Sequence, residues 1–302
     1  MNYLKIGDKE VRVTNLDKVY DDKNNISKKD CINYYIKVFP YIKPFIENRP
    51  VSLKRFPNGF NDKGFYQKNV DETFPKWIQV VEKKGLEKYP LINNIETFIY
   101  LTNLGTIEFH PWMSTIHDLE APEYGVFDID PMKRFTFKEV IKVAKTIYSV
   151  LELLKLKSAA KLSGSTGIQI YLPVKDGYSY ERVRELVRKI SVVVNNKLSD
   201  TTTLVRKREL RSEKIYLDFL QNVKGQTIVA PFSIRPKPKA PISVPVCWDK
   251  MLKSDTVNSA QHYNINNIDL QEIKEGHHLF MEILSQKQEI EPAENILSKI
   301  LK

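Results

Sequence analysis

The sequence predicts an α+β fold built around a mixed or antiparallel sheet with helices flanking it. Some short segments alternate apolar and polar residues, as the two faces of a strand require, and residues 214–220 (KIYLDFL) are an example. Other segments repeat apolar residues every three or four positions, as one face of a helix requires. The clearest of these helical stripes is formed by Val183, Leu186, Val187, Ile190 and Val194.

The N-terminal part is predicted to begin with a capped helix. Ser27 can cap a helix that runs through residues 31–46. Pro40 and Pro44 must bend or divide this helix, because proline lacks the backbone N–H and its ring clashes with the preceding turn. Residues 51–110 alternate short apolar or aromatic segments with turn-rich ones, which predicts several strands.

The remaining elements follow in order along the chain. Thr136 and Glu139 have capping-box spacing, and an apolar helical stripe follows them. Residues 158–174 predict a β-hairpin, and the proline-rich residues 230–248 predict an ordered loop or extended arm. From about residue 262 onward the chain is predicted to be helical and polar.

Length and composition indicate a compact globular protein. The 302 residues are 42% hydrophobic and 28% charged, and they contain no internal repeat or low-complexity tract. We therefore predict one domain over residues 1–302. Its expected parts are an N-terminal lobe at about 1–110, a catalytic lobe at about 111–260 and a C-terminal helical segment at about 261–302.

The charge balance favours a polyanionic partner. The 47 basic residues outnumber the 37 acidic ones, which gives a net charge of +10 and a pI near 9.3, although solvated lysines on a generic basic protein would give the same totals. No apolar run approaches the ~20 residues of a membrane helix, and no secretory signal is expected. Cys31 and Cys247 lack metal-type spacing, so neither a disulfide framework nor a zinc site is expected and a reducing cytoplasm fits.

An acidic strand is the most informative feature. In YGVFDIDP, residues 124–131, strand spacing places Asp128 and Asp130 on one face, where their charges repel and are costly to desolvate. Asp218 lies in a later strand of the same pattern, so three carboxylates can form an oxygen cage for Mg²⁺ or Mn²⁺. Alternatively, the two acids end a strand in water before Pro131. Metal-dependent nucleases and sugar-nucleotide transferases use similar acidic clusters.

The order of motifs resembles one known family. VTNLDKVY, ENRPVSLKRFPNGF, FYQKN, GTIEFHPW, FDIDP, KLSGSTGIQIYLPV, YLDFLQN and TIVAPFSIRPKPKAPISVPVCWDKM occur in that sequence. Together they resemble the polymerase domain of bacterial ligase D, a member of the archaeo-eukaryotic primase superfamily, from about residue 10 to beyond residue 250. The resemblance implies a primase-like α+β fold with a metal cleft between two lobes.

The resemblance also implies roles for individual residues. Asp128, Asp130 and Asp218 would hold two catalytic Mn²⁺ or Mg²⁺ ions. The residues that would contact the incoming nucleotide are His110, Ser163, Gly164, Gln169, Arg235, Lys68 and Arg55. Taken singly, these side chains also fit a packed histidine, an ordinary hairpin turn and solvated basic residues. Gln169 departs from the family, which usually has histidine there, and we expect weakened nucleotide binding because an amide cannot become cationic.

A DNA-end pocket is implied as well. Asn15, Lys18 and Lys28 match the family's pocket for the 5′-phosphate across a gap or break, although without the resemblance they would be scattered surface residues.

The implied function is a template-dependent nucleotidyltransferase that fills gaps and extends DNA 3′ ends, tends to favour ribonucleotides and acts in non-homologous end joining. Its expected partners are nucleoside triphosphates and Ku. A separate DNA ligase is also expected, because no K-x-D-G ligase motif occurs. The expected location is the nucleoid-containing cytoplasm. The alternatives are a stand-alone DNA primase and a catalytically weak DNA-end-binding module.

Overall fold

The computed structural model describes residues 2–6, 9–83, 85–211, 213–253 and 257–302. The chain divides into two compact units that are each assembled from separate segments, so the three consecutive parts expected from the sequence do not match the bodies of the fold. Unit 1 comprises Met1–His117, Thr227–Val244 and Tyr263–Lys274, and unit 2 comprises Asp118–Gln226, Pro245–His262 and Glu275–Lys302. The prediction of a single functional domain stays a prediction.

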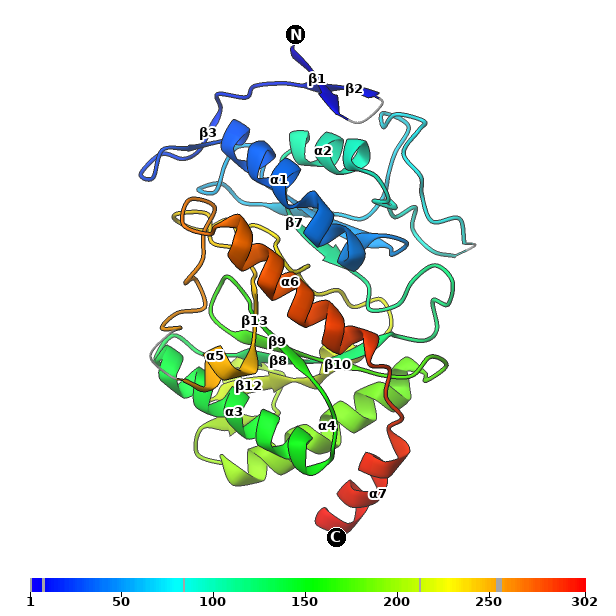
Figure 1. Cartoon of the computed structure of the whole chain (residues 1–302), viewed down its shortest axis with the longest axis vertical. Helices are drawn as coiled ribbons and strands as arrows, with labels where there is room; N and C mark the ends of the chain where they lie inside the picture. The colour runs from blue at the N-terminus through cyan, green and yellow to red at the C-terminus, as the bar shows by residue number, and fades with distance from the viewer. Residues whose placement is uncertain (1, 7–8, 84, 212, 254–256) are drawn as a thin grey trace. The chain divides into compact units, whose positions relative to one another are not determined.

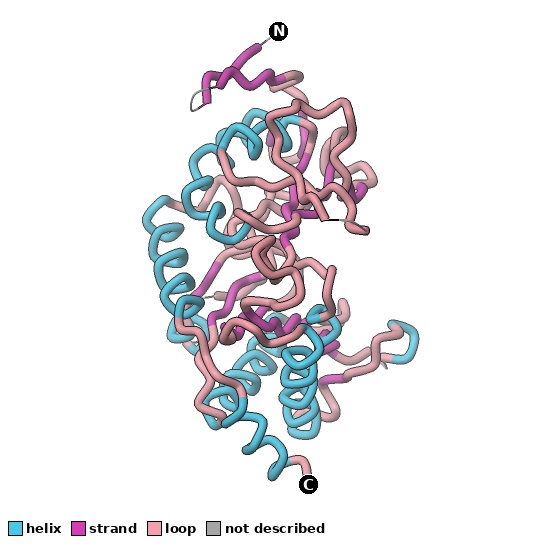
Figure 2. Tube along the Cα trace, turned by 90° about the vertical axis from the view of Figure 1, so that its right-hand side faces the viewer, coloured by secondary structure: helices cyan, strands magenta, loops and turns pink. Residues whose placement is uncertain are grey.

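Unit 1 is built on a three-stranded antiparallel sheet in the order β6-β5-β7, formed by Phe65–Gln67, Val51–Arg55 and Thr106–Pro111. Two hairpins precede it: β1 (Asn2–Ile6) with β2 (Lys9–Val13), and β3 (Val19–Asp21) with β4 (Ile26–Ser27). Long loops connect the short strands of this unit (Figure 2). The strands predicted within residues 51–110 are therefore confirmed.

Helix α1 (Lys28–Ile46) begins as predicted, with Ser27 as its N-cap and a reciprocal capping box with Asp30. Of the two predicted effects of the prolines, a division of the helix does not occur, because one helix contains both Pro40 and Pro44, and a bend stays a prediction. Its apolar side is buried along the whole length, and we attribute its continuity to that packing, which offsets the hydrogen bonds that the prolines cannot donate.

Helix α2 (Ile95–Asn103) was not predicted from the sequence. Asn94 caps it by accepting a hydrogen bond from the backbone N–H of Thr97. Phe98 of α2 packs against Tyr35 of α1 and Phe109 of β7, with ring centroids 5.0 and 4.5 Å away. These aromatic contacts join both helices to the sheet and form the centre of the unit 1 core.

Unit 2 is built on a six-stranded mixed sheet, in the order β11-β12-β8-β10-β9-β13. All neighbours are antiparallel except the parallel pair β11 and β12. The strands are β11 (Thr202–Thr203), β12 (Ile215–Asp218), β8 (Tyr124–Asp130), β10 (Ile168–Pro173), β9 (Ala159–Leu162) and β13 (Pro245–Val246). The predicted hairpin (β9 and β10) and the predicted mixed sheet are confirmed.

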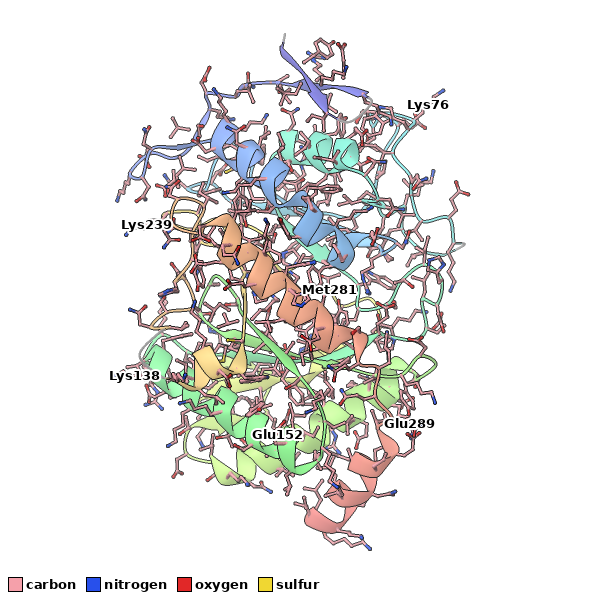
Figure 3. All side chains as sticks on the ribbon, in the orientation of Figure 1. Lys76, Lys138, Glu152, Lys239, Met281 and Glu289 are labelled. Carbon is pink, nitrogen blue, oxygen red and sulfur yellow. The ribbon has the colours of Figure 1, made fainter. Side chains whose placement is uncertain are left out.

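Helices α3 (Phe137–Leu153) and α4 (Tyr180–Lys197) lie together beside the strands of unit 2 (Figure 1). The Thr136 capping box begins α3 as predicted. Figure 3 labels Lys138 and Glu152, two exposed residues of α3. At Gly125, an added Cβ would stand 2.9 Å from Val183 of α4, so only glycine fits this close approach.

Since side chains alternate along β8, the odd-numbered residues Gly125, Phe127 and Ile129 face α4, and Asp128 and Asp130 face away from it. The helical packing therefore sets which face of the sheet carries the acids.

The rest of unit 2 is mostly helical. A short 3₁₀ turn, η2 (Phe219–Asn222), follows β12, so Phe219 leaves the strand in which it was predicted. The other described helices of unit 2 are η1 (Arg208–Leu210), α5 (Trp248–Leu252) and α7 (Glu291–Ile300). Helix α6 (Leu270–Ser285) begins among the residues of unit 1 and continues among those of unit 2, and α6 and α7 confirm the predicted helical C-terminal part. Across the part of the chain that the structure describes, no helix combines the length and apolarity needed to cross a membrane.

Candidate active site

Asp128 and Asp218 are cross-strand partners. They occupy directly opposed positions on the antiparallel strands β8 and β12, and Asp130 opposes Tyr216 two positions further along. The sheet thus brings together acids that are 90 residues apart in the sequence, on the face that the sequence pattern predicted.

The carboxyl group of Asp128 is in a strongly perturbed environment. Burial is the main reason that its pKa rises to about 6, and the nearby carboxylates of Asp218 and Asp130 add to this rise. A hydrogen bond of 3.1 Å from Nε2 of Gln169 acts in the opposite direction. Burial also raises the pKa of Asp218. The two opposed acids therefore carry negative charge at a cost that a cation would relieve.

The other two acids have protein partners. Oδ1 of Asp218 accepts hydrogen bonds from the hydroxyl of Tyr216 (3.1 Å) and the backbone N–H of Leu220 (2.9 Å). Oδ2 of Asp130 pairs with Nη1 of Arg211 at 3.1 Å, and the Arg211 guanidinium lies 4.0 Å from the ring centroid of Tyr216. Asp130 is thus held by a cation of the protein itself.

These contacts test whether the three acids fit a divalent ion. The donor set consists of carboxylate oxygens, the chemistry that Mg²⁺ and Mn²⁺ prefer, and Asp128 and Asp218 are adjacent. Among the described residues, however, no three histidine, cysteine, aspartate or glutamate side chains form a group that could hold a metal ion. Asp130 is also paired with Arg211 through one of its two oxygens, and the three-acid site stays a prediction.

Gln169 has two partners within the sheet, and its predicted contact with a nucleotide stays a prediction. It lies opposite Asp128 on β10 and, on its other side, opposite Lys161 on β9. Nζ of Lys161 donates to Oε1 of Gln169 at 2.5 Å, while Nε2 of Gln169 donates to Asp128. Both ends of the amide are therefore occupied within the sheet.

The turn between β9 and β10 contains the Ser-Gly motif. The hydroxyl of Ser163 accepts the backbone N–H groups of Ser165 (3.1 Å) and Gly167 (3.0 Å), and Gly164 has a left-handed φ of +68°. An added Cβ at Gly167 would stand 1.9 Å from the carbonyl oxygen of Ile129, so this glycine permits direct contact between the turn and β8.

A cavity connects this turn with the acidic strand. It has a volume of about 350 Å³ and lies in unit 2 at the end of β8. Asp130, Ser165, Thr166, Lys133 and Arg208 contribute to its lining together with apolar side chains. Asp130 and two residues of the Ser-Gly turn, Ser165 and Thr166, therefore adjoin one space.

Unit 1 contains a separate cluster of basic side chains around Glu108, which is 1% exposed. Arg235 donates from Nε at 2.6 Å, His110 contacts the carboxylate through Nε2 at 2.9 Å, and Nζ of Lys54 lies 3.4 Å away. Burial alone would raise the pKa of Glu108, but Arg235, His110 and Lys54 outweigh it and hold that pKa well below its usual range. One buried carboxylate thus orients three basic groups, two of which the sequence pointed to.

The protonation of His110 follows from this arrangement. Burial lowers its pKa below the usual value, and the charges of Arg235 and Lys54 lower it further, although Glu108 acts in the opposite direction. The imidazole is neutral at pH 7, and Nε2 must carry its proton because it faces the ionised Glu108. Nδ1 then has a lone pair.

Arg55 and Lys68 have structural contacts in unit 1. The Arg55 guanidinium donates twice to the carbonyl of Leu104 and, at 2.6 Å, to Gln67. Lys68 is an exposed lysine whose Nζ lies 3.8 Å from Glu87. Their proposed roles toward a nucleotide stay predictions.

The three residues predicted to bind a 5′-phosphate are brought together in unit 1. Asn15 begins a turn that Lys18 closes, and the backbone N–H of Lys28 donates to the carbonyl of Lys18 at 2.8 Å. Lys28 is the first residue of α1, whose helix dipole favours an anion, although the N–H groups of Lys28 and Lys29 already donate to backbone carbonyls. Burial, and secondarily the charge of Lys18, lowers the pKa of Lys28 to about 8.

Comparison with protein families adds an independent observation. The model of the family described as "LigD, primase-polymerase domain" matches residues 27–280, which is most of the chain. The chain belongs to this family. LigD primase-polymerase domains are metal-dependent nucleotidyltransferases, and this membership confirms the resemblance found in the motifs.

Curated relatives agree with the assignment. The chain is 32% identical over 248 residues to the bifunctional non-homologous end joining protein LigD of Bacillus subtilis, covering 82% of this chain and 40% of that protein. It is 28% identical to the multifunctional non-homologous end joining protein LigD of Mycolicibacterium smegmatis, covering 80% of this chain and 32% of that protein. The chain thus spans about a third to two fifths of these relatives.

A solved structure has the same fold. The polymerase domain of Mycobacterium tuberculosis ligase D, determined in complex with DNA, superposes with a TM-score of 0.79 at 21% identity, covering 92% of this chain and 99% of that one. This likeness confirms the predicted primase-like α+β fold. The metal cleft expected between two lobes stays a prediction.

Several candidate residues of this LigD-type domain were missed in the sequence. Lys161 and Glu108 are almost fully buried charges, and their significance lies in cross-strand contacts that no local pattern reveals. Lys54 opposes Glu108 on β5, and Arg211 pairs with Asp130. The K-x-S-G and K-R-F motifs contain these lysines, but their neighbours across the sheet follow only from the strand pairing.

Proposed function

We propose that this chain is the polymerase module of a double-strand break repair system, adding nucleotides to a DNA 3′ end under the direction of a template. The observation that supports this most is the direct opposition of Asp128 and Asp218 within a primase-polymerase domain. In the proposed reaction the primer 3′-hydroxyl attacks the α-phosphate of a nucleoside triphosphate, and pyrophosphate leaves.

Asp128, Asp218 and Asp130 are the residues that would hold Mg²⁺ or Mn²⁺. Such ions supply two things to nucleotidyl transfer: they favour ionisation of the attacking hydroxyl and neutralise charge on the phosphates. The acids themselves supply a preorganised negative surface at the edge of β8 and β12. Arg211 would exchange its partner Asp130 for solvent or substrate when the site is filled.

The triphosphate is assigned to basic groups with fixed orientations. Glu108 holds the Arg235 guanidinium and the His110 ring in place, so little side-chain freedom is lost when an anion binds them. Ser163 and Gly164 would contribute the turn that adjoins the acidic strand in unit 2. For Arg55 and Lys68, we retain a role near the nucleotide only as a proposal.

The DNA end is assigned to Asn15, Lys18 and Lys28. Burial, and secondarily the charge of Lys18, lowers the pKa of Lys28, and the carbonyl of Lys18 accepts from the first residue of α1. A phosphate dianion would relieve the repulsion between the two lysines and accept hydrogen bonds from their ammonium groups. The pocket would let the domain distinguish a phosphorylated gap from a simple primer-template.

The cellular role is proposed from the relatives. The Bacillus and Mycolicibacterium proteins are named for non-homologous end joining, and each is much longer than this chain. We infer that this domain serves the same process in the nucleoid-containing cytoplasm, prefers ribonucleotides and cooperates with Ku and a DNA ligase.

The test is extension of a gapped duplex carrying a 5′-phosphate, with each nucleotide type and with Mg²⁺ or Mn²⁺ in turn. We expect templated addition in which ribonucleotides are used at least as well as deoxyribonucleotides. Asp128→Asn should abolish it. Asp176→Asn, which removes an exposed carboxylate paired with Lys287 in the same unit, should not.

Two outcomes would contradict the proposal: no incorporation by the unaltered protein with either metal, or incorporation that survives Asp128→Asn. Products formed on single strands without a primer would favour the primase alternative. Tight binding of DNA ends without any incorporation would favour the binding-module alternative.

A further inference from the structure

Four polar residues form a row across the sheet of unit 2. Lys161 on β9 opposes Gln169 on β10, Gln169 opposes Asp128 on β8, and Asp128 opposes Asp218 on β12. Directly opposed residues of antiparallel strands have Cβ atoms about 5 Å apart, so neighbours in such a row interact. The row runs from a buried lysine to the two opposed acids.

The contacts along this row have a defined direction. The Lys161 ammonium has only N–H donors, so the atom of Gln169 that faces it at 2.5 Å must be the carbonyl oxygen Oε1. The amide nitrogen of Gln169 is then forced to point toward Asp128, whose Oδ1 it reaches at 3.1 Å. Lys161 therefore fixes the amide, and the amide fixes one oxygen of the carboxylate.

The position of Lys161 is energetically demanding. Its side chain is 0% exposed, and its ammonium lies 5.9 Å from the ring centroid of Tyr171, which itself packs on Phe280. A lysine is almost never fully buried without compensating contacts, because desolvation of the charge is costly. An apolar residue at this place in a sheet would serve packing better, so packing alone does not explain the lysine.

We propose that Lys161 and Gln169 are positioning residues that hold the Asp128 carboxylate in the orientation in which it binds a divalent cation. This inference rests on the proposed function only in taking Asp128 as a metal ligand. Residues that hold metal ligands by hydrogen bonds typically change metal affinity by about 10–100-fold when they are removed. In this chain an amide supported by a buried ammonium performs that task.

The experiment measures Mn²⁺ affinity by electron paramagnetic resonance on the full chain, without DNA or nucleotide. Lys161→Met and Gln169→Leu each remove one step of the row, and each should weaken Mn²⁺ binding by about 10-fold or more. Because the lysine acts through the amide, the double variant should bind no more weakly than Gln169→Leu alone. Lys145→Met is the matched control, since it removes a lysine that donates to the Leu252 carbonyl elsewhere in unit 2.

A conservative variant separates positioning from a general structural role. Gln169→His can accept from Lys161 with one ring nitrogen and donate to Asp128 with the other, so it should retain Mn²⁺ affinity within about threefold. Thermal melts identify variants that do not fold. If Lys161→Met does not fold, the comparison of Gln169→Leu with Gln169→His decides the question.

The proposal is overturned if folded Lys161→Met or Gln169→Leu binds Mn²⁺ within twofold of the unaltered protein, if their effects add in the double variant, or if Asp128→Asn leaves Mn²⁺ binding unchanged. These results are independent of catalysis. A protein that binds Mn²⁺ through this row but incorporates no nucleotide would contradict the proposed function and leave the inference intact.

Discussion

Asp128 and Asp218 stand directly opposite each other on neighbouring antiparallel strands, and both have a raised pKa. Like charges at directly opposed positions of a sheet destabilise it. The metal-free domain therefore keeps an unfavourable arrangement that a bound cation would turn into a favourable one. The first prediction follows from this relationship.

Asp128→Asn should stabilise the metal-free protein while abolishing nucleotide incorporation. The folded pKa of about 6 lies above the unfolded value near 3.9, so ionisation of Asp128 begins to cost stability above about pH 4, and the cost is complete above about pH 6. Thermal melts in a chelator should show a higher Tm for the variant at pH 8 and no difference at pH 4. An equal or lower Tm at pH 8 would contradict the predicted strain.

Lys18→Ala and Lys28→Ala should reduce extension of 5′-phosphorylated gaps more than extension of simple primer-templates, because both lysines are assigned to the downstream phosphate. Since the pKa of Lys28 is about 8, the preference for a 5′-phosphate should fall as pH rises from 7 to 9. Lys28→Arg should keep the preference at pH 9, because a guanidinium stays charged. Equal losses on both substrates would argue against a dedicated pocket.

Nucleoside triphosphate binding should take up a proton at His110. Nε2 already donates to Glu108 and the ring is neutral, so Nδ1 can contact a phosphate oxygen only after protonation. Affinity should therefore rise as pH falls from 8 to 6, by up to about tenfold per pH unit. Calorimetry in buffers of different ionisation enthalpy measures the uptake, which His110→Gln should eliminate. Proton uptake that persists in His110→Gln would mean that a group other than His110 takes up the proton.

Glu108→Gln should destabilise the fold by about 3 kcal/mol or more, because Arg235 and Lys54 would lose a buried counter-charge. The folded pKa of Glu108 lies below its unfolded value near 4.3, so its ionic stabilisation is present above that pH and is lost as pH falls. Urea unfolding should show that the difference in free energy of unfolding between the unaltered protein and Glu108→Gln is smaller at pH 3 than at pH 7. Glu289→Gln, which opens an exposed pair with Lys175, should leave the free energy of unfolding nearly unchanged.

Gln169→His distinguishes two explanations of the glutamine. If Gln169 contacts phosphate, as the sequence suggested, histidine should improve the nucleotide KM. The structure commits both ends of the amide to Lys161 and Asp128, so we expect the nucleotide KM to change by less than about twofold. A clear improvement in KM would restore the phosphate-contact interpretation.

Local signals in the sequence were sufficient for much of the fold. The caps at Ser27 and Thr136, and the alternating faces of β8 and β12, follow from hydrogen bonding and side-chain direction within a few residues. Helix α2 was missed because it is short, buried on most sides and rich in β-branched and aromatic residues, so no polar stripe marks it. Which segments join unit 1 depends on tertiary contacts, which the sequence order does not encode.

The candidate site shows the same limit. Spacing placed Asp128 and Asp130 on one face, the pattern of a later strand added Asp218, and the family resemblance supplied the basic residues. The roles of Lys161 and Glu108 depend on which strand lies beside which, because each acts through a residue on the same or the next strand. The role of a buried charged residue can be identified only when the residues around it are known.

The contact between the Gly167 backbone and the Ile129 carbonyl has a mechanical consequence. Because there is no room for even a methyl group between them, the loop that carries Ser163 packs directly against the strand that carries Asp128, and we expect the two to move as one rigid unit. A shift of either would be transmitted to the other within a fraction of an ångström. A substrate-induced movement in unit 2 would then displace the Ser163 hydroxyl and the Asp128 carboxylate together. Gly167→Ala would separate the loop from the strand.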